Sequence, residues 1–357
     1  MKIAVACGGT GGHAFPGLAV ATELVKRGHE VTVWDSGRDI ESSIMKSWQG
    51  AAFSTGARQL SPKNAFSIAR SLLRCRRQMR KDRPDVLLAM GSYSSLPPVL
   101  AARSCSVPIV LHEANTVPGR AVEFLARFAK KIAISFPETS KYLPGGKTVL
   151  TGLPVRSGIA SGARFGFIPS ESFTVFVTGG SQGAHMVNYL ASEALAMMKG
   201  ELSRRGDAAK RPLYAIHQTG VADEGTVMAT YALASLPSRV HAFEQNMADA
   251  FASADIVIAR AGASTCFELA TCGKPAILVP LPSATRNHQH FNAAAFVSKG
   301  AADEGVQEKL TPKQLCRYLL DKYDHPEKLL AMAAKARGLA IPDAAARVAD
   351  LVERTAK

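Results

Sequence analysis

Short apolar runs alternate with longer amphipathic segments along most of the chain. The short runs are almost continuous in Val, Ile, Leu and Ala, which indicates strands buried on both faces, and the helix-length segments between them indicate parallel pairing. Strands are expected at Ile3–Cys7, Glu30–Trp34, Val86–Met90, Ile109–His112, Lys131–Ser135, Val149–Thr151, Phe173–Thr178, Leu213–Gln218, Val240–Phe243, Ile256–Ala259 and Ala276–Val279. The pattern predicts an α/β protein built on doubly wound parallel sheets.

The strand series stops and restarts near the middle of the chain, which predicts two domains. Gly152–Arg156 is the expected junction, and the glycine-rich residues 157–169 are typical of a linker or loop. The domains are expected at residues 1–155 and 156–340, and a length of 357 residues is sufficient for two complete cores. Asp343–Thr355 has the pattern of an amphipathic helix that either domain could accept.

Two glycine-rich turns, Gly8–Gly12 and Gly179–Gly183, each follow an apolar run directly. A strand, a glycine turn and a helix N-terminus together form an anion pocket, because backbone N–H groups point into it and the helix dipole favours negative charge. The first helix is expected at Pro16–Arg27, with proline at its start and Gly28 after its end. Two such turns predict two nucleotide-binding folds around a shared cleft, with a ligand that carries phosphates.

Composition narrows the class of protein. Apolar residues make up 47% and charged residues 20% of the chain, as in ordinary globular proteins. No apolar run approaches the ~18 residues of a membrane-spanning helix, and the N-terminal run is too short for a signal peptide, so we expect no export. The 6 cysteines show neither a Cys-x-x-Cys pair nor zinc-site spacing, so we expect a reducing cytoplasm and no metal. The net charge of +14 indicates an anionic partner as well as solubility.

Two familiar motifs overlap the glycine turns. Gly9–Ala14, with Asp35 ending the next strand, matches a dinucleotide fingerprint and keeps a nicotinamide-dependent oxidoreductase open as an alternative. Two features count against the oxidoreductase. His13 would stand where the helix should approach the pyrophosphate closely, and the second glycine turn would have no role. Gly179–Gly183 also matches the nucleophile elbow of an α/β-hydrolase. Such an elbow follows several strands of its own domain, whereas this one opens a new domain, so Ser181 is better interpreted as a phosphate-binding hydroxyl.

Basic residues concentrate between Arg70 and Arg83 at helical spacing. The apolar positions expected to face the core are Phe66, Ala69, Leu72, Leu73 and Met79. The basic side is either a solvated face or a surface for an anionic membrane, where each cation contributes about 1 kcal/mol. Nucleic acid is disfavoured as a partner, because no aromatic residue is interleaved with the cations. The candidate membrane contacts are Arg70, Leu73, Arg74, Arg77 and Arg80.

Arg260–Glu268, directly after a predicted strand, carries the strongest chemical pattern of the second half. Gly262 permits a sharp turn, and the N–H groups and hydroxyls that follow, including Thr265, are placed to meet a diphosphate. Glu268 falls one turn further, where two carboxylate oxygens match a ribose diol. The alternative to a ribose-binding role is that the Glu268 carboxylate only interacts favourably with the helix dipole, by about 0.3–1 kcal/mol. Gln289 lies among polar residues after the next strand, the edge at which open sheets bind ligands.

Two histidines of the first half lie at the corresponding edge. His13 is in the first glycine turn, and His112 ends a predicted strand just before Glu113. A histidine with a pKa near ~6.5 accepts a proton from an alcohol at neutral pH. His13 is the better base candidate, because its glycine neighbours leave room for a substrate. The alternatives are helix capping for His13 and a structural hydrogen bond for His112.

In order along nearly the whole chain, these motifs resemble those of the MurG family, which adds N-acetylglucosamine to a lipid-linked cell-wall precursor. The motifs are Gly8-Gly9-Thr10-Gly11-Gly12-His13-x-x-Pro16, His112-Glu113-x-Asn115, Gly152-x-Pro154-Val155-Arg156, Gly179-Gly180-Ser181-Gln182-Gly183-Ala184 and Arg260-x-Gly262-Ala263-x-Thr265-x-x-Glu268. Each motif is weak alone, but the ordered set is specific. The resemblance implies a GT-B fold, with two Rossmann-like domains facing a cleft and residues 341–357 packing back on the first.

The resemblance also implies substrates and sites. The donor would be UDP-N-acetylglucosamine, and the acceptor undecaprenyl-diphosphate-linked N-acetylmuramyl-pentapeptide. The reaction would invert the anomeric carbon and need no cofactor. The implied donor contacts are Thr10, Gly11, Gly12, Asn115, Arg156, Ser181, Thr265, Glu268 and Gln289. The implied contacts of the acceptor diphosphate are Gly9, Thr10, Gly12, His13 and Tyr93. His13 would be the base, with Glu113 as a second catalytic candidate. The enzyme would be peripheral on the cytoplasmic side of the cell membrane, against its anionic inner face.

The chain departs from the family pattern in two places. Gly91-Ser92-Tyr93-Ser94-Ser95 stands where many members have Gly-Gly-Tyr followed by Ser-Gly-Pro, so the acceptor loop is expected to have a different shape. Asn287 stands where aspartate is common. The nearest alternative function is that of another GT-B UDP-sugar enzyme, either a small-molecule glycosyltransferase or an epimerase. A non-catalytic membrane scaffold is an alternative of a different class.

Overall fold

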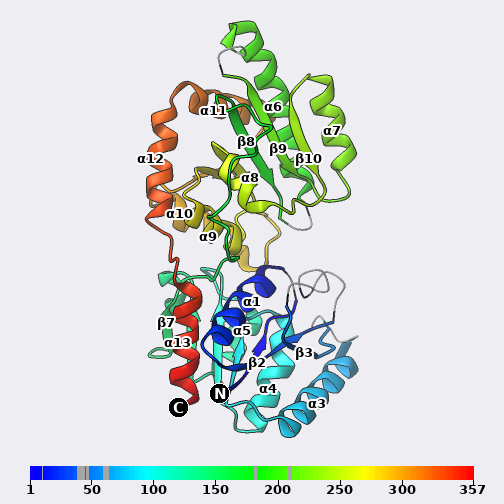
Figure 1. Cartoon of the computed structure of the whole chain (residues 1–357), viewed down its shortest axis with the longest axis vertical. Coiled ribbons are helices and arrows are strands. Elements are labelled where there is room, and N and C mark those ends of the chain that lie inside the picture. Colours follow the sequence, from blue (N-terminus) through cyan, green and yellow to red (C-terminus); the bar gives the residue numbers. More distant parts are fainter. Residues whose placement is uncertain (10, 38–44, 46–47, 59–63, 181–182, 208–210) are drawn as a thin grey trace. The chain divides into compact units, whose positions relative to one another are not determined.

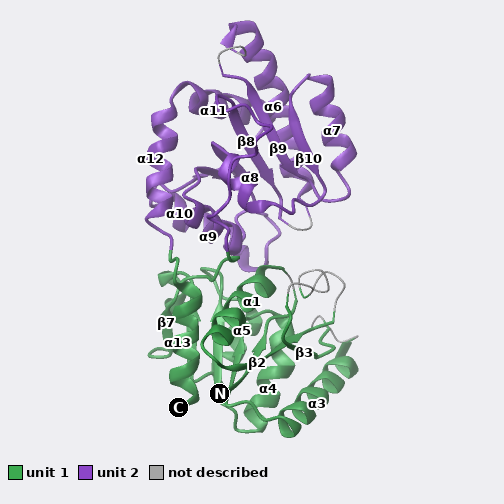
Figure 2. Cartoon of the chain, in the orientation of Figure 1, with its two compact units in different colours: residues 1–157, 341–357 green, residues 158–340 purple. Residues whose placement is uncertain are grey.

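The chain forms two compact units, residues 1–157 with 341–357 and residues 158–340, which Figure 2 draws in green and purple. This computed structural model describes all residues except 10, 38–44, 46–47, 59–63, 181–182 and 208–210. In each unit, helices flank a parallel sheet, as Figure 1 shows. The predicted fold class, α/β with parallel sheets, is confirmed.

The first unit contains a seven-stranded sheet with the order β3-β2-β1-β4-β5-β6-β7, and every neighbouring pair is parallel. Its strands are β1 (Lys2–Ala6), β2 (Glu30–Asp35), β3 (Ala51–Ser54), β4 (Val86–Ala89), β5 (Ile109–Glu113), β6 (Lys131–Ile134) and β7 (Thr148–Leu150). Strand order reverses beside β1, so the loops after β1 and β4 lie next to each other at the carboxyl edge. Ligands of open α/β sheets bind at such a point.

Helices cover both faces of this sheet. They are α1 (Gly11–Lys26), α3 (Ala65–Lys81), α4 (Leu96–Ser104), α5 (Arg120–Leu125) and α13 (Ala344–Ala356), with the 3₁₀ turns η2 (Tyr93–Ser95) and η3 (Pro137–Tyr142). One core cluster joins α1 and α13 to the sheet, and a second joins α3, α4 and α5 to its other face. The C-terminal helix is also held by polar contacts: Arg27 Nη1 lies 2.6 Å from Asp350 Oδ1, and His29 Nε2 lies 2.8 Å from Glu353 Oε1.

The second unit contains a six-stranded parallel sheet with the order β10-β9-β8-β11-β12-β13. Its strands are β8 (Phe173–Thr178), β9 (Leu213–Gln218), β10 (Ser238–His241), β11 (Ile256–Ala259), β12 (Ala276–Leu278) and β13 (Asp303–Glu304). Its helices are α6 (His185–Arg205), α7 (Glu224–Leu233), α8 (Met247–Ser253), α9 (Ala263–Cys272), η5 (Thr285–Asn287), α10 (His288–Val297), α11 (Pro312–Asp324) and α12 (Pro326–Arg337). The central strand β8 is buried along its whole length.

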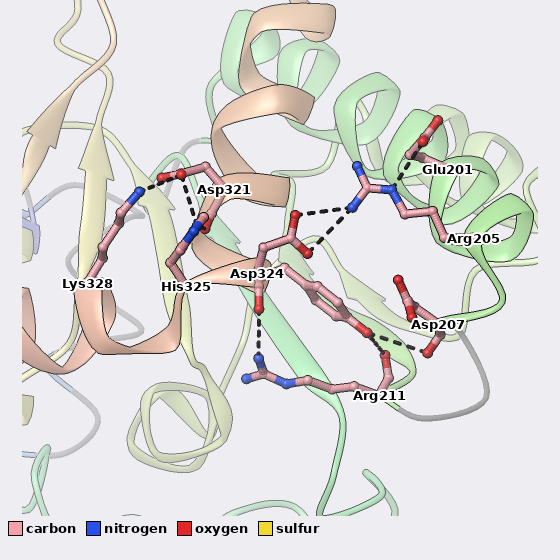
Figure 3. Close-up of polar contacts among 9 residues, drawn as sticks. Glu201, Arg205, Asp207, Arg211, Asp321, Asp324, His325 and Lys328 are labelled. Atoms are coloured by element: carbon pink, nitrogen blue, oxygen red, sulfur yellow. Dashed lines mark hydrogen bonds and ion pairs between the residues drawn. The ribbon is translucent and has the colours of Figure 1, made fainter.

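A polar network ties α6 to α11 and to the segment before β9, at the C-terminal end of α6 (Figure 3). Arg205 of α6 lies 3.1 Å from the Asp324 carboxylate, and Arg211 Nη1 donates to the Tyr323 carbonyl at 3.4 Å. The Tyr323 hydroxyl donates back to the Arg211 carbonyl at 2.9 Å. Because α6 begins beside the second glycine turn, fixing its far end limits rotation of the whole helix.

Every predicted strand is present, shifted by at most 2 residues. The two strands that were not predicted, β3 and β13, are short and partly exposed, so they lack the buried apolar run on which the prediction relied. The predicted start of the first helix is wrong. The helix begins at Gly11, directly from the glycine turn, and Pro16 lies inside it. Proline lacks the N–H that would bond the carbonyl four residues back, but packing of α1 on the sheet outweighs that loss.

Candidate functional site

The first glycine turn brings α1 close to the sheet. Gly9 has a φ of 117°, a conformation that favours glycine. A Cβ added to Gly17, on the second turn of α1, would lie 2.2 Å from Cys7 Cβ, so the helix approaches the end of β1 as closely as glycine allows. The N-terminal N–H groups of α1 therefore lie at the carboxyl edge of the sheet, where an anion would bind. Gly11 and Gly12 begin this helix, whereas Thr10, a predicted contact of both substrates, lies outside the described residues.

His13 and His112 are close enough to interact electrostatically but differ in exposure. His13 is half-buried on α1, and a Cβ added to Gly91 would lie 3.7 Å from its Cδ2. His112 is fully buried, and its Nε2 donates to the Gly152 carbonyl at 3.4 Å. Burial lowers the pKa of His112 to about 4, and repulsion from His13 adds to the shift. His112 is therefore neutral and inaccessible at pH 7, and His13 is the histidine of this pair that a substrate can reach.

Glu113 organises the loop after β5. One carboxylate oxygen accepts from the backbone N–H of Asn115 at 2.8 Å and from its side-chain amide at 3.1 Å. The other accepts from the N–H of Gly119 at 3.0 Å. Burial raises the pKa of Glu113, and these hydrogen bonds oppose the rise. The geometry gives Glu113 a clear structural task, which is to hold Asn115, half-buried beside it, in place.

Two further predicted residues lie on the same unit. Tyr93 is half-buried in η2, in the loop that follows β4. The guanidinium of Arg156 stacks on the ring of Phe15 of α1, 4.4 Å from its centroid. The structure therefore gathers Tyr93, His13, Asn115 and Arg156 on the loops and helix start of the first unit, and places Thr265, Glu268 and Gln289 on the second.

In the second unit, Gly262 is the N-cap residue of α9, as the sequence predicted for the sharp turn. Thr265 is half-buried in the first turn of α9, and Glu268 is buried in the second. Asn292 of α10, itself fully buried, donates to the Ala261 carbonyl at 3.1 Å and so fixes the approach to the turn. The start of α9 thus presents N–H groups and a hydroxyl, with a carboxylate one turn deeper.

The next loop of this unit is held by two long side chains. Arg260 Nη1 donates to the carbonyls of Val279 and Pro280 at 3.0 and 3.1 Å. Gln289 Oε1 accepts from the N–H of Leu281 at 3.0 Å. Burial lowers the pKa of the Arg260 guanidinium, and among the described residues no carboxylate forms an ion pair with it. A buried cation without an acidic partner adds positive potential at this edge, beside the N-terminus of α9.

The second glycine turn is fastened mainly by an amide and by close backbone packing. Gln218, buried at the end of β9, donates from Nε2 to the Gly180 carbonyl at 2.8 Å. A Cβ added to Gly183 would lie 2.1 Å from the Thr219 carbonyl oxygen. Asn188 of α6 donates to that same Thr219 carbonyl at 2.8 Å. Sequence reasoning missed Gln218 and Asn188, and Ser181 lies outside the described residues.

The basic segment is a helix, and its buried side is only partly the one predicted: Met79 is fully buried and Leu72 packs against the core, as expected. Ser71, Cys75 and Met79 face the core at four-residue spacing, whereas Phe66 is 81% and Leu73 55% exposed. The prediction that Phe66, Ala69 and Leu73 line the core is wrong, because the i, i+4 row through Cys75 packs on the sheet instead. The five predicted membrane contacts, Arg70, Leu73, Arg74, Arg77 and Arg80, are all exposed.

The described residues contain neither a membrane-spanning helix nor a metal-binding cluster of side chains. No helix in the described ranges combines the length and apolar character needed to cross a bilayer. In the same part of the chain, no three His, Cys, Asp or Glu side chains gather closely enough to hold a metal ion.

Two parallel-sheet α/β units, each with a glycine turn leading into a helix, are the architecture of GT-B glycosyltransferases. Residues 3–134 match the glycosyltransferase family 28 N-terminal domain, and residues 174–352 match the family 28 C-terminal domain. The chain belongs to glycosyltransferase family 28.

Relatives of nearly the same length carry one name. A protein of Geotalea uraniireducens is 36% identical over 99% of this chain and 98% of its own length. One of Myxococcus xanthus is 36% identical over 98% of this chain and 92% of its own. Both are named UDP-N-acetylglucosamine--N-acetylmuramyl-(pentapeptide) pyrophosphoryl-undecaprenol N-acetylglucosamine transferase. The predicted membership of the MurG family is confirmed.

Solved structures agree with this assignment. The crystal structure of Acinetobacter baumannii MurG is 32% identical and matches with a TM-score of 0.78 over 99% of this chain and 100% of its own. The UDP-GlcNAc 2-epimerase of Neisseria meningitidis bound to UDP-GlcNAc matches with a TM-score of 0.69 over 99% of this chain and 100% of its own. At 13% identity, that second likeness extends to the fold alone.

Proposed function

We propose that this chain transfers N-acetylglucosamine from UDP-N-acetylglucosamine to the 4-hydroxyl of N-acetylmuramyl-pentapeptide carried on undecaprenyl diphosphate. The hydroxyl oxygen attacks the anomeric carbon, the bond from that carbon to the UDP oxygen breaks, and UDP leaves with the bonding electrons. The hydroxyl proton passes to a protein base. The observation that carries the proposal is the 36% identity over 99% of the chain to a relative with that activity in its name.

The second unit would hold the donor. Glu268 is assigned to the ribose hydroxyls, and Thr265 to the diphosphate at the start of α9, with Ser181 assigned to the same phosphates. Gln289 is half-buried in the first turn of α10 and would contact the sugar or the diphosphate. The N–H groups of α9 and the buried positive charge of Arg260 would stabilise the charge that develops on departing UDP, and such electrostatic stabilisation is usually the largest contribution to catalysis of this kind.

The first unit would hold the acceptor. Gly9, Thr10, Gly12 and Tyr93 are assigned to its diphosphate at the start of α1. His13 is assigned as base, because its imidazole is half-buried whereas that of His112 is fully buried. Glu113 is buried and hydrogen-bonded within the loop after β5, so it would contribute by holding Asn115 in position. Asn115, Arg156, Gly11 and Gly12 would complete the donor contacts.

The basic face of α3 would lie on anionic lipid at the cytoplasmic side of the cell membrane. A neighbouring cavity of about 400 Å³, at the amino ends of β5 and β6, is lined by Arg103, Arg127 and Lys130 among others. Arg83, just after α3, donates to the carbonyl of Ser106 on the rim of this cavity at 3.1 Å. Arg83 therefore links the chain just after α3 to the rim of this basic cavity.

The test is transfer of labelled N-acetylglucosamine from its UDP donor to a lipid I analogue by the purified chain. We expect one labelled disaccharide per UDP released. Release of UDP without labelled acceptor, or conversion of the donor to its epimer, would contradict the proposal.

A further inference from the structure

The loop after β4 contains a backbone conformation that is costly for its residue. Ser92 has φ 67° and ψ 170°, in a region essentially restricted to glycine. It follows Gly91, whose φ is 86°, and precedes the 3₁₀ turn η2. A side chain persists in such a conformation only where its surroundings enforce it, and such positions cluster at functional sites. The contacts of the Ser92 side chain must therefore stabilise this backbone conformation.

Ser92 and Ser94 converge on one carbonyl of the first glycine turn. Ser94 Oγ donates to the Gly8 carbonyl at 2.5 Å, and Ser94 is buried. Ser92 Oγ lies 3.0 Å from the same carbonyl and 2.6 Å from Ser94 Oγ, so its single hydrogen serves one of these two acceptors. It also accepts from the backbone N–H of Ser94 at 3.2 Å. Two side chains more than 80 residues away in sequence thus hold the peptide that opens the turn.

The same loop packs against both ends of the first glycine turn. A Cβ added to Gly9 would lie 2.7 Å from Ser92 Oγ, so the hydroxyl closes the space beside the turn. At the other end, a Cβ on Gly91 would lie 3.7 Å from His13 Cδ2. Residues 91–94 therefore hold the Gly8 carbonyl and also lie beside the His13 ring.

We infer that Ser92 and Ser94 are positioning residues for the acceptor side of the reaction: their hydroxyls fix the Gly8 peptide, so that the N–H groups of α1 and the imidazole of His13 keep one orientation toward the acceptor diphosphate and its sugar. The inference rests on the proposed function. Neither serine needs to touch a substrate. Ser92 retains its strained backbone because only a side chain at that point supplies the second hydroxyl.

The experiment compares Ser94→Ala and Ser92→Ala with a matched control, Ser71→Ala. Ser71 is also buried in the first unit and also donates to a backbone carbonyl, that of Thr55 at 2.8 Å. We expect Ser94→Ala to lower kcat/KM for the acceptor about tenfold while the donor KM changes less than about twofold. The melting temperature should shift no more than in Ser71→Ala. The inference would be overturned if kcat/KM fell equally for donor and acceptor, or if kcat/KM for the acceptor fell no more than in Ser71→Ala.

A second measurement requires no activity. Amide hydrogen exchange of the full chain should become about tenfold faster from Gly8 to Phe15 in Ser94→Ala and remain unchanged from Gly179 to Asn188. Unchanged exchange in the first segment would overturn the inference even if the chain proved to have another substrate. Absence of transfer by the unsubstituted chain, together with faster exchange in the variant, would refute only the proposed function.

Ser92→Gly separates strain from hydrogen bonding. Glycine adopts the observed φ and ψ without strain, so this variant should melt at a higher temperature than Ser92→Ala. It should nevertheless show the same reduced kcat/KM for the acceptor, because both variants lack the hydroxyl. Full activity in Ser92→Gly would show that the hydroxyl has no role.

Discussion

The two glycine turns follow the same local plan, strand, turn and helix, but different groups hold them. At the first, serine hydroxyls from the loop after β4 reach the Gly8 carbonyl, and a half-buried histidine lies within the first turn of α1. At the second, the Gln218 amide holds the Gly180 carbonyl, and Gly183 packs directly against the backbone of Thr219.

The histidines beside the two turns also differ. His185, the first residue of α6, is largely exposed, and its Nδ1 lies 2.9 Å from the Asp223 carboxylate. The His13 ring lies close to Gly91, in the loop after β4. The first turn therefore combines a helix N-terminus with a half-buried histidine, whereas the second combines a helix N-terminus with the support of a neutral amide. This difference matches the proposed division between an acceptor to be activated and a donor to be held.

The largest expected effect tests this division at the histidines. His13→Ala should lower kcat by about 10²–10⁴-fold with little change in donor KM, because a general base contributes that much. His185→Ala, its counterpart at the second turn, should change kcat less than about threefold. Steady-state transfer assays measure both. If the two variants lose activity equally, the turns do not differ in the way proposed.

The next effect concerns packing of the turns. Gly183→Ala meets a backbone oxygen at 2.1 Å and adopts a φ of 75°, so we expect a loss of about 2–4 kcal/mol in the free energy of unfolding. Gly9→Ala also has a strained φ, 117°, but it meets the Ser92 hydroxyl, which can shift at the cost of its hydrogen bonds, rather than backbone, and should cost about 1 kcal/mol less. Denaturant unfolding of the two variants checks the order. The reverse order would mean that the serine loop is the more rigid support.

Two carboxylates sharpen the comparison further. Glu268→Gln should raise the donor KM about tenfold with a smaller effect on kcat, because an amide NH₂ group would replace one of the two carboxylate oxygens proposed to accept from the ribose hydroxyls. Glu113→Gln should instead lower the free energy of unfolding by about 1–3 kcal/mol, since an NH₂ group would face the N–H of Asn115 or Gly119. A raised donor KM in Glu113→Gln with unchanged stability would contradict the structural role of Glu113.

Each unit contains one buried histidine whose charging opposes folding. Burial lowers the pKa of His112 to about 4 and that of His217 to about 3. The pKa of a histidine in the unfolded chain is about 6.5, so the unfolded chain binds protons at a higher pH than the folded chain does. The free energy of unfolding therefore decreases as pH falls below about 6.5, and it goes on decreasing until pH reaches the folded pKa values. At pH 5.5 the loss should be about 1.4 kcal/mol per histidine.

Equilibrium unfolding between pH 7 and 5 measures this loss. His217→Gln should reduce the pH-dependent loss of unfolding free energy by roughly the contribution of one histidine. His217 Nδ1 lies 2.8 Å from the Tyr231 hydroxyl and Nε2 3.1 Å from Asn188 Oδ1, so the ring is neutral and fully paired in the folded chain. A profile that is flat in the unsubstituted chain would contradict the neutral assignment of both rings.

The smallest effect compares the surfaces of the units. Arg77→Gln on α3 should weaken sedimentation with anionic vesicles about fivefold, as expected for one cation near acidic headgroups. Arg204→Gln, at a position in the second unit where the side chain is 77% exposed, should leave sedimentation unchanged. Equal losses in the two variants would indicate attraction by net charge alone rather than by the face of α3.

The sequence by itself determined much about this protein. Near-continuous apolar runs predicted every strand except β3 and β13, because a strand buried on both faces has little freedom in composition. Glycine turns after β1 and β8 predicted the two anion pockets, and the ordered motifs predicted the family. These signals are local: each needs only a few consecutive residues to be recognised.

Only the tertiary structure decided which side chains support the turns. Ser92 and Gln218 reach carbonyls 84 and 38 residues away, and no local pattern marks such a pairing. The buried side of α3 was equally hidden, because its apolar and small residues allow more than one face and packing on the sheet selects the row through Cys75. Side-chain hydrogen bonds and helix orientation are set by whatever lies opposite in space, and that is not a property of any single stretch of chain.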